Sequence, residues 1–136
     1  MRFFSWRSTK TTPPDEPIRR KAPRMTEMGR YILDYCSHSA DAEQYAREHL
    51  ERFVRTLELT PRGSSEDRVL EMGAYMQITP ALHHRLGYGE VRGSDLGPAG
   101  EVVHKQARSV NGEEFECDID LFNAERDPFP YPDQHF

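Results

Sequence analysis

The sequence predicts an α/β fold, and three observations lead to this prediction. The length of 136 residues corresponds to one ordinary domain. Residues 26–36 and 41–57 carry apolar side chains at the three-to-four-residue spacing that is typical of helices. From Arg68 onward the pattern changes to short strands that are separated by glycine turns and one helix. We therefore expect helices first and a sheet afterwards.

Residues 1–24 predict a disordered basic arm. They contain the run Thr11-Thr12-Pro13-Pro14-Asp15-Glu16-Pro17, in which the prolines prevent a regular helix. This stretch holds seven Lys or Arg against two Asp or Glu, a net charge of +5.

The rest of the chain excludes several classes of protein. Residues 25–136 hold eleven Lys or Arg against twenty-one Asp or Glu, a net charge of −10, and an acidic body argues against nucleic-acid binding. No apolar run approaches the roughly 20 residues that cross a bilayer, and no apolar signal segment follows the first residues. Cys36 and Cys117 match no metal-binding spacing. We expect a cytoplasmic protein without a transmembrane segment or a metal, with both thiols reduced and buried.

Residues 25–60 are predicted to form two helices. In the first, residues 26–36, Thr26 is the expected cap. In the second, residues 41–57, Asp41 followed by Gln44 resembles a capping box. One apolar stripe of this second helix is formed by Tyr45, Leu50, Phe53, Val54 and Leu57.

Residues 66–136 are predicted to form the sheet. A strand over 68–72 leads into Gly73, a helix over 79–86 follows, and a second strand over 90–95 ends in an acid. Segments 102–110 and 114–121 are expected to pair as a hairpin, because Asn111-Gly112 is the strongest short hairpin signal.

The order strand, glycine turn, helix, strand and acid is typical of the first half of a nucleotide-binding unit. The glycine allows the backbone to approach a ligand, and a carboxylate at the end of the second strand can accept from both ribose hydroxyls. Asp95 follows Gly73 by 22 residues, close to the expected spacing of about 20.

Three segments in this order resemble one family. Val69-Leu70-Glu71-Met72-Gly73-Ala74 resembles the first motif of class I S-adenosylmethionine-dependent methyltransferases of the type 11-like group, and Asp95 resembles their second-strand acid. The segment NAERDPFPYPDQHF, residues 123–136, resembles the D-A-E-x-L-P-F-P segment that precedes their fourth strand. The resemblance covers residues 66–136. It implies the front half of a Rossmann-like, doubly wound sheet in a three-layer α/β/α arrangement, with S-adenosylmethionine as the cofactor.

The resemblance also implies a cofactor site, whose residues would be Glu71, Gly73, Ala74, Tyr75, Asp95, Asp120 and Asn123. Glu71 would order the loop at the methionine end of the cofactor, and Gly73 would give close backbone approach. Asp95 would hold the ribose hydroxyls. Either Asp120 or Asn123 would face the adenine, and the sequence leaves both open. The catalytic residues and the methyl acceptor are not predicted.

The chain also departs from the family. Tyr75 and Gln77 stand where the family has its second and third glycines, and a Cβ there restricts the backbone. The sequence ends at Phe136, where the fourth strand would begin, so we expect a fragment with an open edge at its first strand. Such a chain would not transfer methyl groups alone and would tend to self-associate. The alternative is a non-catalytic binding module derived from the same fold. A sheet that binds a different nucleotide is a third interpretation.

Overall fold

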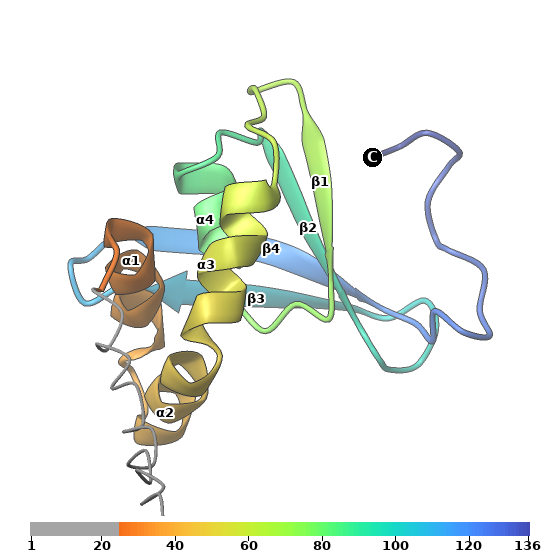
Figure 1. Cartoon of the computed structure of the whole chain (residues 1–136). Helices are drawn as coiled ribbons and strands as arrows, with labels where there is room; N and C mark the ends of the chain where they lie inside the picture. Colours follow the sequence, from red (N-terminus) through yellow and green to blue (C-terminus); the bar gives the residue numbers. More distant parts are fainter. Residues whose placement is uncertain (1–24) are drawn as a thin grey trace, which may run out of the picture.

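The structure is a computed structural model that describes residues 25–136 (Figure 1). This part of the chain has an α/β fold, as predicted. Its elements in chain order are α1 (Glu27–Cys36), α2 (Ala40–Glu48), α3 (Leu50–Leu59), β1 (Arg68–Met72), α4 (Thr79–His84), β2 (Glu90–Asp95), β3 (Val102–Arg108) and β4 (Glu114–Leu121). The arm predicted for residues 1–24 lies outside the described residues. In the described part, no helix has the length and apolar character needed to cross a membrane.

The helical region confirms the first predicted helix and its cap. The side chain of Thr26 accepts a hydrogen bond of 3.0 Å from the Gly29 N–H at the start of α1. The prediction of Asp41 as the second cap is wrong. The Ser39 hydroxyl accepts from the Ala42 N–H instead, so α2 begins earlier than expected.

The prediction of one helix over residues 41–57 is also wrong, because the helix is interrupted at His49. The backbone of His49 has φ −110° and ψ 9°, which ends α2 and begins α3. Phe53 and Leu57 of α3 are buried, whereas Tyr45 of α2 stays exposed. The break lets α3 turn its apolar side into the core independently of α2.

The sheet has four strands in the order β1-β2-β4-β3. β1, β2 and β4 are parallel, and β3 pairs antiparallel with β4. The predicted hairpin between residues 102 and 121 is therefore confirmed, and Gly112 at its turn has φ +86°. Among these strands, β1 and β3 form the two edges.

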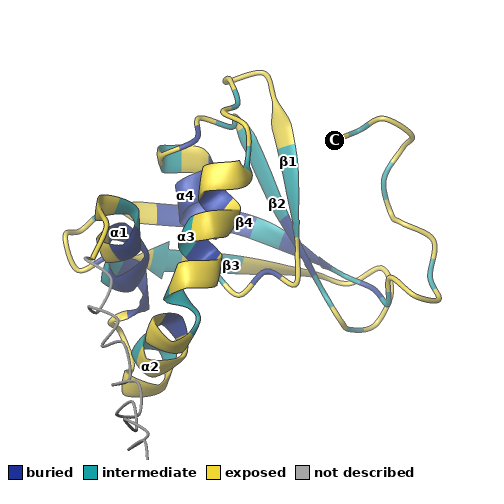
Figure 2. Ribbon diagram, viewed as in Figure 1, coloured by how far each residue is buried: buried dark blue, intermediate teal, exposed yellow. Residues whose placement is uncertain are grey.

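The core lies between the helices and one face of the sheet (Figure 2). Ile32 of α1, Leu57 of α3 and Ile119 of β4 are almost completely buried. The residues described thus form two layers, helices and sheet, and contain no third layer of helices. On the other face, Tyr131 of the C-terminal segment contacts Asp120 of β4.

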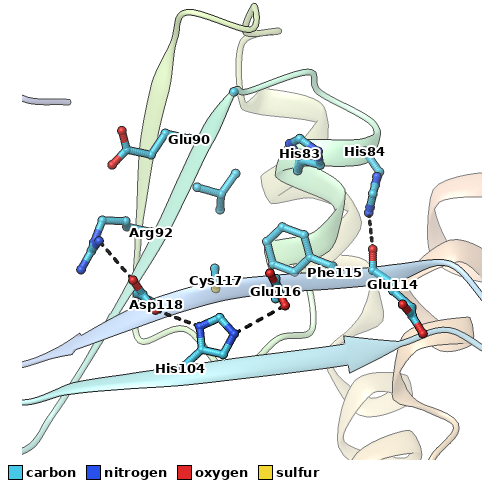
Figure 3. Close-up of a pocket in the computed structure, with 12 residues that line it drawn as sticks. His83, His84, Glu90, Arg92, His104, Glu114, Phe115, Glu116, Cys117 and Asp118 are labelled. Atoms are coloured by element: carbon cyan, nitrogen blue, oxygen red, sulfur yellow. Dashed lines mark hydrogen bonds and ion pairs between the residues drawn. The ribbon is translucent and has the colours of Figure 1, made fainter.

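The strands β2 and β4 pair over only three residues each. Their register joins Gly93 to Ile119, and it ends at Asp95 with Leu121. Before these residues the two strands diverge, as the view in Figure 3 shows. The carboxyl ends of the parallel strands are therefore close together, whereas the amino ends of β2 and β4 are separated.

Candidate functional site

The predicted glycine turn lies at the carboxyl end of β1. Gly73 has φ +70°, a conformation that glycine adopts without strain. The N–H groups of Gly73 and Ala74 donate to the carbonyl oxygen of Ser94 at 2.8 and 3.0 Å. A Cβ at Gly73 would meet no atom within 4 Å. The turn is thus fixed to β2 on one side and open on the other.

Glu71 comes just before this turn and has a buried carboxyl group. Its Oε2 atom has no hydrogen-bond partner, and the same is true of the buried Thr79 Oγ1 at the start of α4. Burial is the main cause that raises the pKa of Glu71 from its ordinary value of 4.5 to about 7. A buried acid with an unpaired oxygen therefore lies beside the open turn.

Asp95 ends β2 and lies next to the turn. The Tyr75 hydroxyl donates to Asp95 Oδ1 at 3.2 Å, and the Leu96 N–H donates to the same oxygen at 2.8 Å. The second oxygen, Oδ2, takes part in neither bond. Tyr75 is 58% exposed, and the ammonium group of Lys105 lies 5.7 Å from the centre of its ring. Tyr75 thus covers the acid that the sequence assigns to ribose binding.

Asp120 is engaged in a different network. It accepts from Arg92 Nε and Nη2 at 2.8 and 2.7 Å, and from the Tyr131 hydroxyl at 2.7 Å. Burial alone would raise the pKa of Asp120, but the hydrogen bonds from Arg92 and Tyr131 outweigh it and lower the pKa. Because residues alternate along a strand, Asp120 lies on the face opposite the buried Ile119, away from the helices. Its ion pair with Arg92 joins β4 to β2.

Asn123 stabilises a turn after β4. Its side-chain oxygen accepts from the Glu125 N–H at 3.0 Å, and its own N–H donates to Asp127 Oδ2 at 2.8 Å. Five of the seven predicted site residues therefore gather at the ends of β1 and β2: Glu71, Gly73, Ala74, Tyr75 and Asp95. The two candidates for adenine contact, Asp120 and Asn123, make the structural contacts described above.

Sequence reasoning missed a second feature, a cleft of about 580 Å³ between the diverging parts of β2 and β4 (Figure 3). It lies at the amino ends of these strands, away from the glycine turn. Its lining includes His83 and His84 of α4, Glu90 and Arg92 of β2, His104 of β3 and Glu116 of β4. Nothing in the local sequence signals this cleft, because it arises where two strands distant in sequence separate.

His104 lies between two carboxylates at the rim of this cleft. Its Nδ1 is 2.9 Å from Asp118 Oδ1, and its Nε2 is 3.5 Å from Glu116 Oε2. The hydrogen bond with Asp118 is the main cause that raises the pKa of His104. In residues 25–136, no group of histidine, cysteine and acidic side chains is arranged to hold a metal ion.

No protein-family model matches the chain, and neither a curated protein nor a solved structure matches it.

Proposed function

We propose that the chain binds S-adenosylmethionine at the carboxyl ends of β1 and β2, as the cofactor half of a Rossmann-like methyltransferase domain. One observation carries the proposal: an open glycine turn lies between a buried, unpaired acid and a second acid at the end of the adjacent parallel strand. Ligands of parallel sheets bind beyond the carboxyl ends of the strands, which is where this group lies.

Each residue of the group fits one part of the cofactor. The open side of Gly73 leaves space for the backbone to approach the methionine moiety. Glu71 Oε2 lacks a partner and would order the turn at that end, directly or through a water molecule. Asp95 Oδ2 would accept a ribose hydroxyl, and Oδ1 would accept a second one if Tyr75 moved aside.

The chemistry of transfer would come mainly from the cofactor, whose sulfonium carries the reactive methyl group. The residues of this chain would hold and orient it, which is the main contribution that such a reaction needs from the protein. A further strand beside the free edge of β1 would complete the domain. The acceptor would then bind between the cofactor and those added elements.

A second candidate is a non-catalytic binding module built on the same fold. The hydrogen bond from Tyr75 to Asp95 favours it, because that bond occupies the acid from within the chain. In this case the turn at Gly73 would serve only to connect β1 to α4.

Isothermal titration calorimetry with S-adenosylmethionine tests the proposal on the full chain. We expect saturable binding that Asp95→Ala weakens about 10- to 100-fold, since hydrogen bonds to a charged group contribute about 1.5–3 kcal/mol. The matched control is Asp133→Ala, which removes an exposed acid of the C-terminal segment. Absence of binding at millimolar cofactor, or equal loss in both variants, would refute the proposal. Binding of a nicotinamide nucleotide in its place would favour the third interpretation.

A further inference from the structure

The cleft between β2 and β4 has the properties of a docking site for an extended peptide. We propose that a segment of another polypeptide, with alternating basic and apolar residues, binds there as an added strand beside the part of β4 that is not paired with β2. Three features of the described residues support this: unpaired backbone groups, an alternating pattern of side chains, and an excess of carboxylates.

The backbone of β4 has a free edge along this cleft. The Ser109 N–H donates to Glu113 O, and the Leu121 N–H donates to Glu101 O, so odd-numbered residues of β4 direct their backbone groups toward β3. The even-numbered residues therefore point toward β2. Because pairing with β2 begins only at Ile119, the N–H and C=O of Glu116 face the cleft without a partner strand. An added strand would satisfy these groups.

The other wall offers a similar edge. Phe122 N–H donates to Asp95 O, which shows that the odd-numbered residues of β2 direct their backbone groups toward β4. Val91 belongs to this set and lies in the diverging part of β2, where it lines the cleft. At the outer end, His84 Nε2 lies 3.1 Å from Glu114 O and occupies that carbonyl. The available edge of β4 therefore centres on Glu116.

The side chains of β4 fix the pattern of the partner. Glu114, Glu116 and Asp118 lie on the outer face of the strand, with side-chain exposures of 72%, 65% and 43%. Phe115 and Cys117 lie on the helix-covered face and are buried. Side chains of an added strand lie beside those on the same face of its neighbour. A bound peptide would thus place basic residues beside the carboxylates and small apolar residues beside Phe115 and Cys117.

The charge of the cleft selects a basic partner. Its lining contains four carboxylates, from Glu90, Glu114, Glu116 and Asp118, against the guanidinium of Arg92 and the imidazoles of His83, His84 and His104. That guanidinium is bound in a bidentate manner to Asp120, and its Nη1 also lies 3.5 Å from Asp118 Oδ2 (Figure 3). The other three acids also have partners on the surface: Glu90 pairs with Arg68, Glu114 with Arg108 and Glu116 with His104. Such exposed ion pairs contribute little in water, so an incoming Lys or Arg can replace them.

Fluorescence anisotropy with the full chain and a labelled peptide tests the inference. The peptide Lys-Val-Lys-Val-Lys-Val has the required alternation, and Lys-Lys-Lys-Val-Val-Val has the same composition without it. We expect the alternating peptide to bind about tenfold more tightly than the block peptide, and its affinity to fall as salt is raised.

Two variants locate the site. Glu116→Lys should weaken binding of the alternating peptide by about tenfold, because it replaces an attraction by a repulsion at the centre of the edge. Glu51→Lys makes the same charge change on the exposed side of α3 and should leave binding unchanged. Equal binding of both peptides, or equal affinity of both variants, would overturn the inference in favour of non-specific charge attraction. A dimer in sedimentation that binds no peptide would assign the edge to a second copy and overturn it as well.

Discussion

Replacing Glu71 by glutamine should stabilise the fold in a pH-dependent manner. The glutamine keeps the size of the side chain but never ionises. In the unfolded chain the Glu71 carboxyl ionises near pH 4.5, whereas in the folded chain burial raises its pKa to about 7. Between these values the folded state binds more protons than the unfolded state. The wild-type chain therefore loses stability as pH rises through this window.

The size of the effect follows from the two pKa values. The difference between 4.5 and about 7 corresponds to a destabilisation of about 3 kcal/mol, which is complete above pH 7 and absent below pH 4.5. Glu71→Gln removes this cost, because the neutral amide resembles the protonated acid. We expect equal stability of the two proteins at pH 4 and an advantage of about 3 kcal/mol for the variant at pH 8.

Urea unfolding monitored by circular dichroism measures this difference directly. Both proteins are unfolded at pH values from 4 to 8.5, and the free energy of the wild type is subtracted from that of the variant. Titration of every other group cancels in the subtraction. A difference that stays constant across this range would show that the carboxyl is not held in a buried, unpaired state.

The remaining predictions concern packing, the outer ion pair and the cofactor. Gly93→Ala should destabilise the fold by about 1–3 kcal/mol in urea unfolding, because its Cβ would collide with buried side chains on the helix side. Asp120→Asn should cost about 2 kcal/mol, and a double-mutant cycle with Arg92→Met should show coupling between these residues; additive losses would contradict a shared network. Tyr75→Phe should bind S-adenosylmethionine about 2- to 10-fold more tightly in calorimetry, because it frees Asp95 Oδ1; weaker binding would mean that Tyr75 contacts the cofactor.

Local patterns in the sequence predicted most of the sheet. The alternation of β4 and the Asn111-Gly112 turn fixed the hairpin, and the run that ends at Gly73 located β1 and its turn. These features depend on residues that are neighbours in the chain. The same local patterns correctly predicted that Glu71 and Asp95 lie near the carboxyl ends of two strands, which pair in parallel in the structure.

Features that depend on distant residues were not predictable in the same way. The break at His49 follows from how α3 packs into the core, and no proline or glycine marks it. The resemblance implied an adenine contact for either Asp120 or Asn123, but it gave no sign of the network of Asp120 with Arg92 and Tyr131, because that network joins three segments of the chain. The divergence of β2 from β4 has a similar origin, because only tertiary structure separates them.

The position of Glu71 in the edge strand β1, next to its last residue, also bears on solubility. An exposed strand edge can pair with other chains and begin aggregation, and proteins oppose this with charges that point inward from the edge. Pairing of another strand with the free edge of β1 would bury the carboxyl of Glu71 further and raise the free-energy cost of ionising it. The residue that weakens the fold above neutral pH therefore also opposes the pairing of an unrelated strand with this edge, and the further strand proposed above would have to leave its carboxyl hydrated or hydrogen-bond it. The ionised carboxyl of Glu71 thus lowers the free energy of unfolding and at the same time protects the edge of β1 against aggregation.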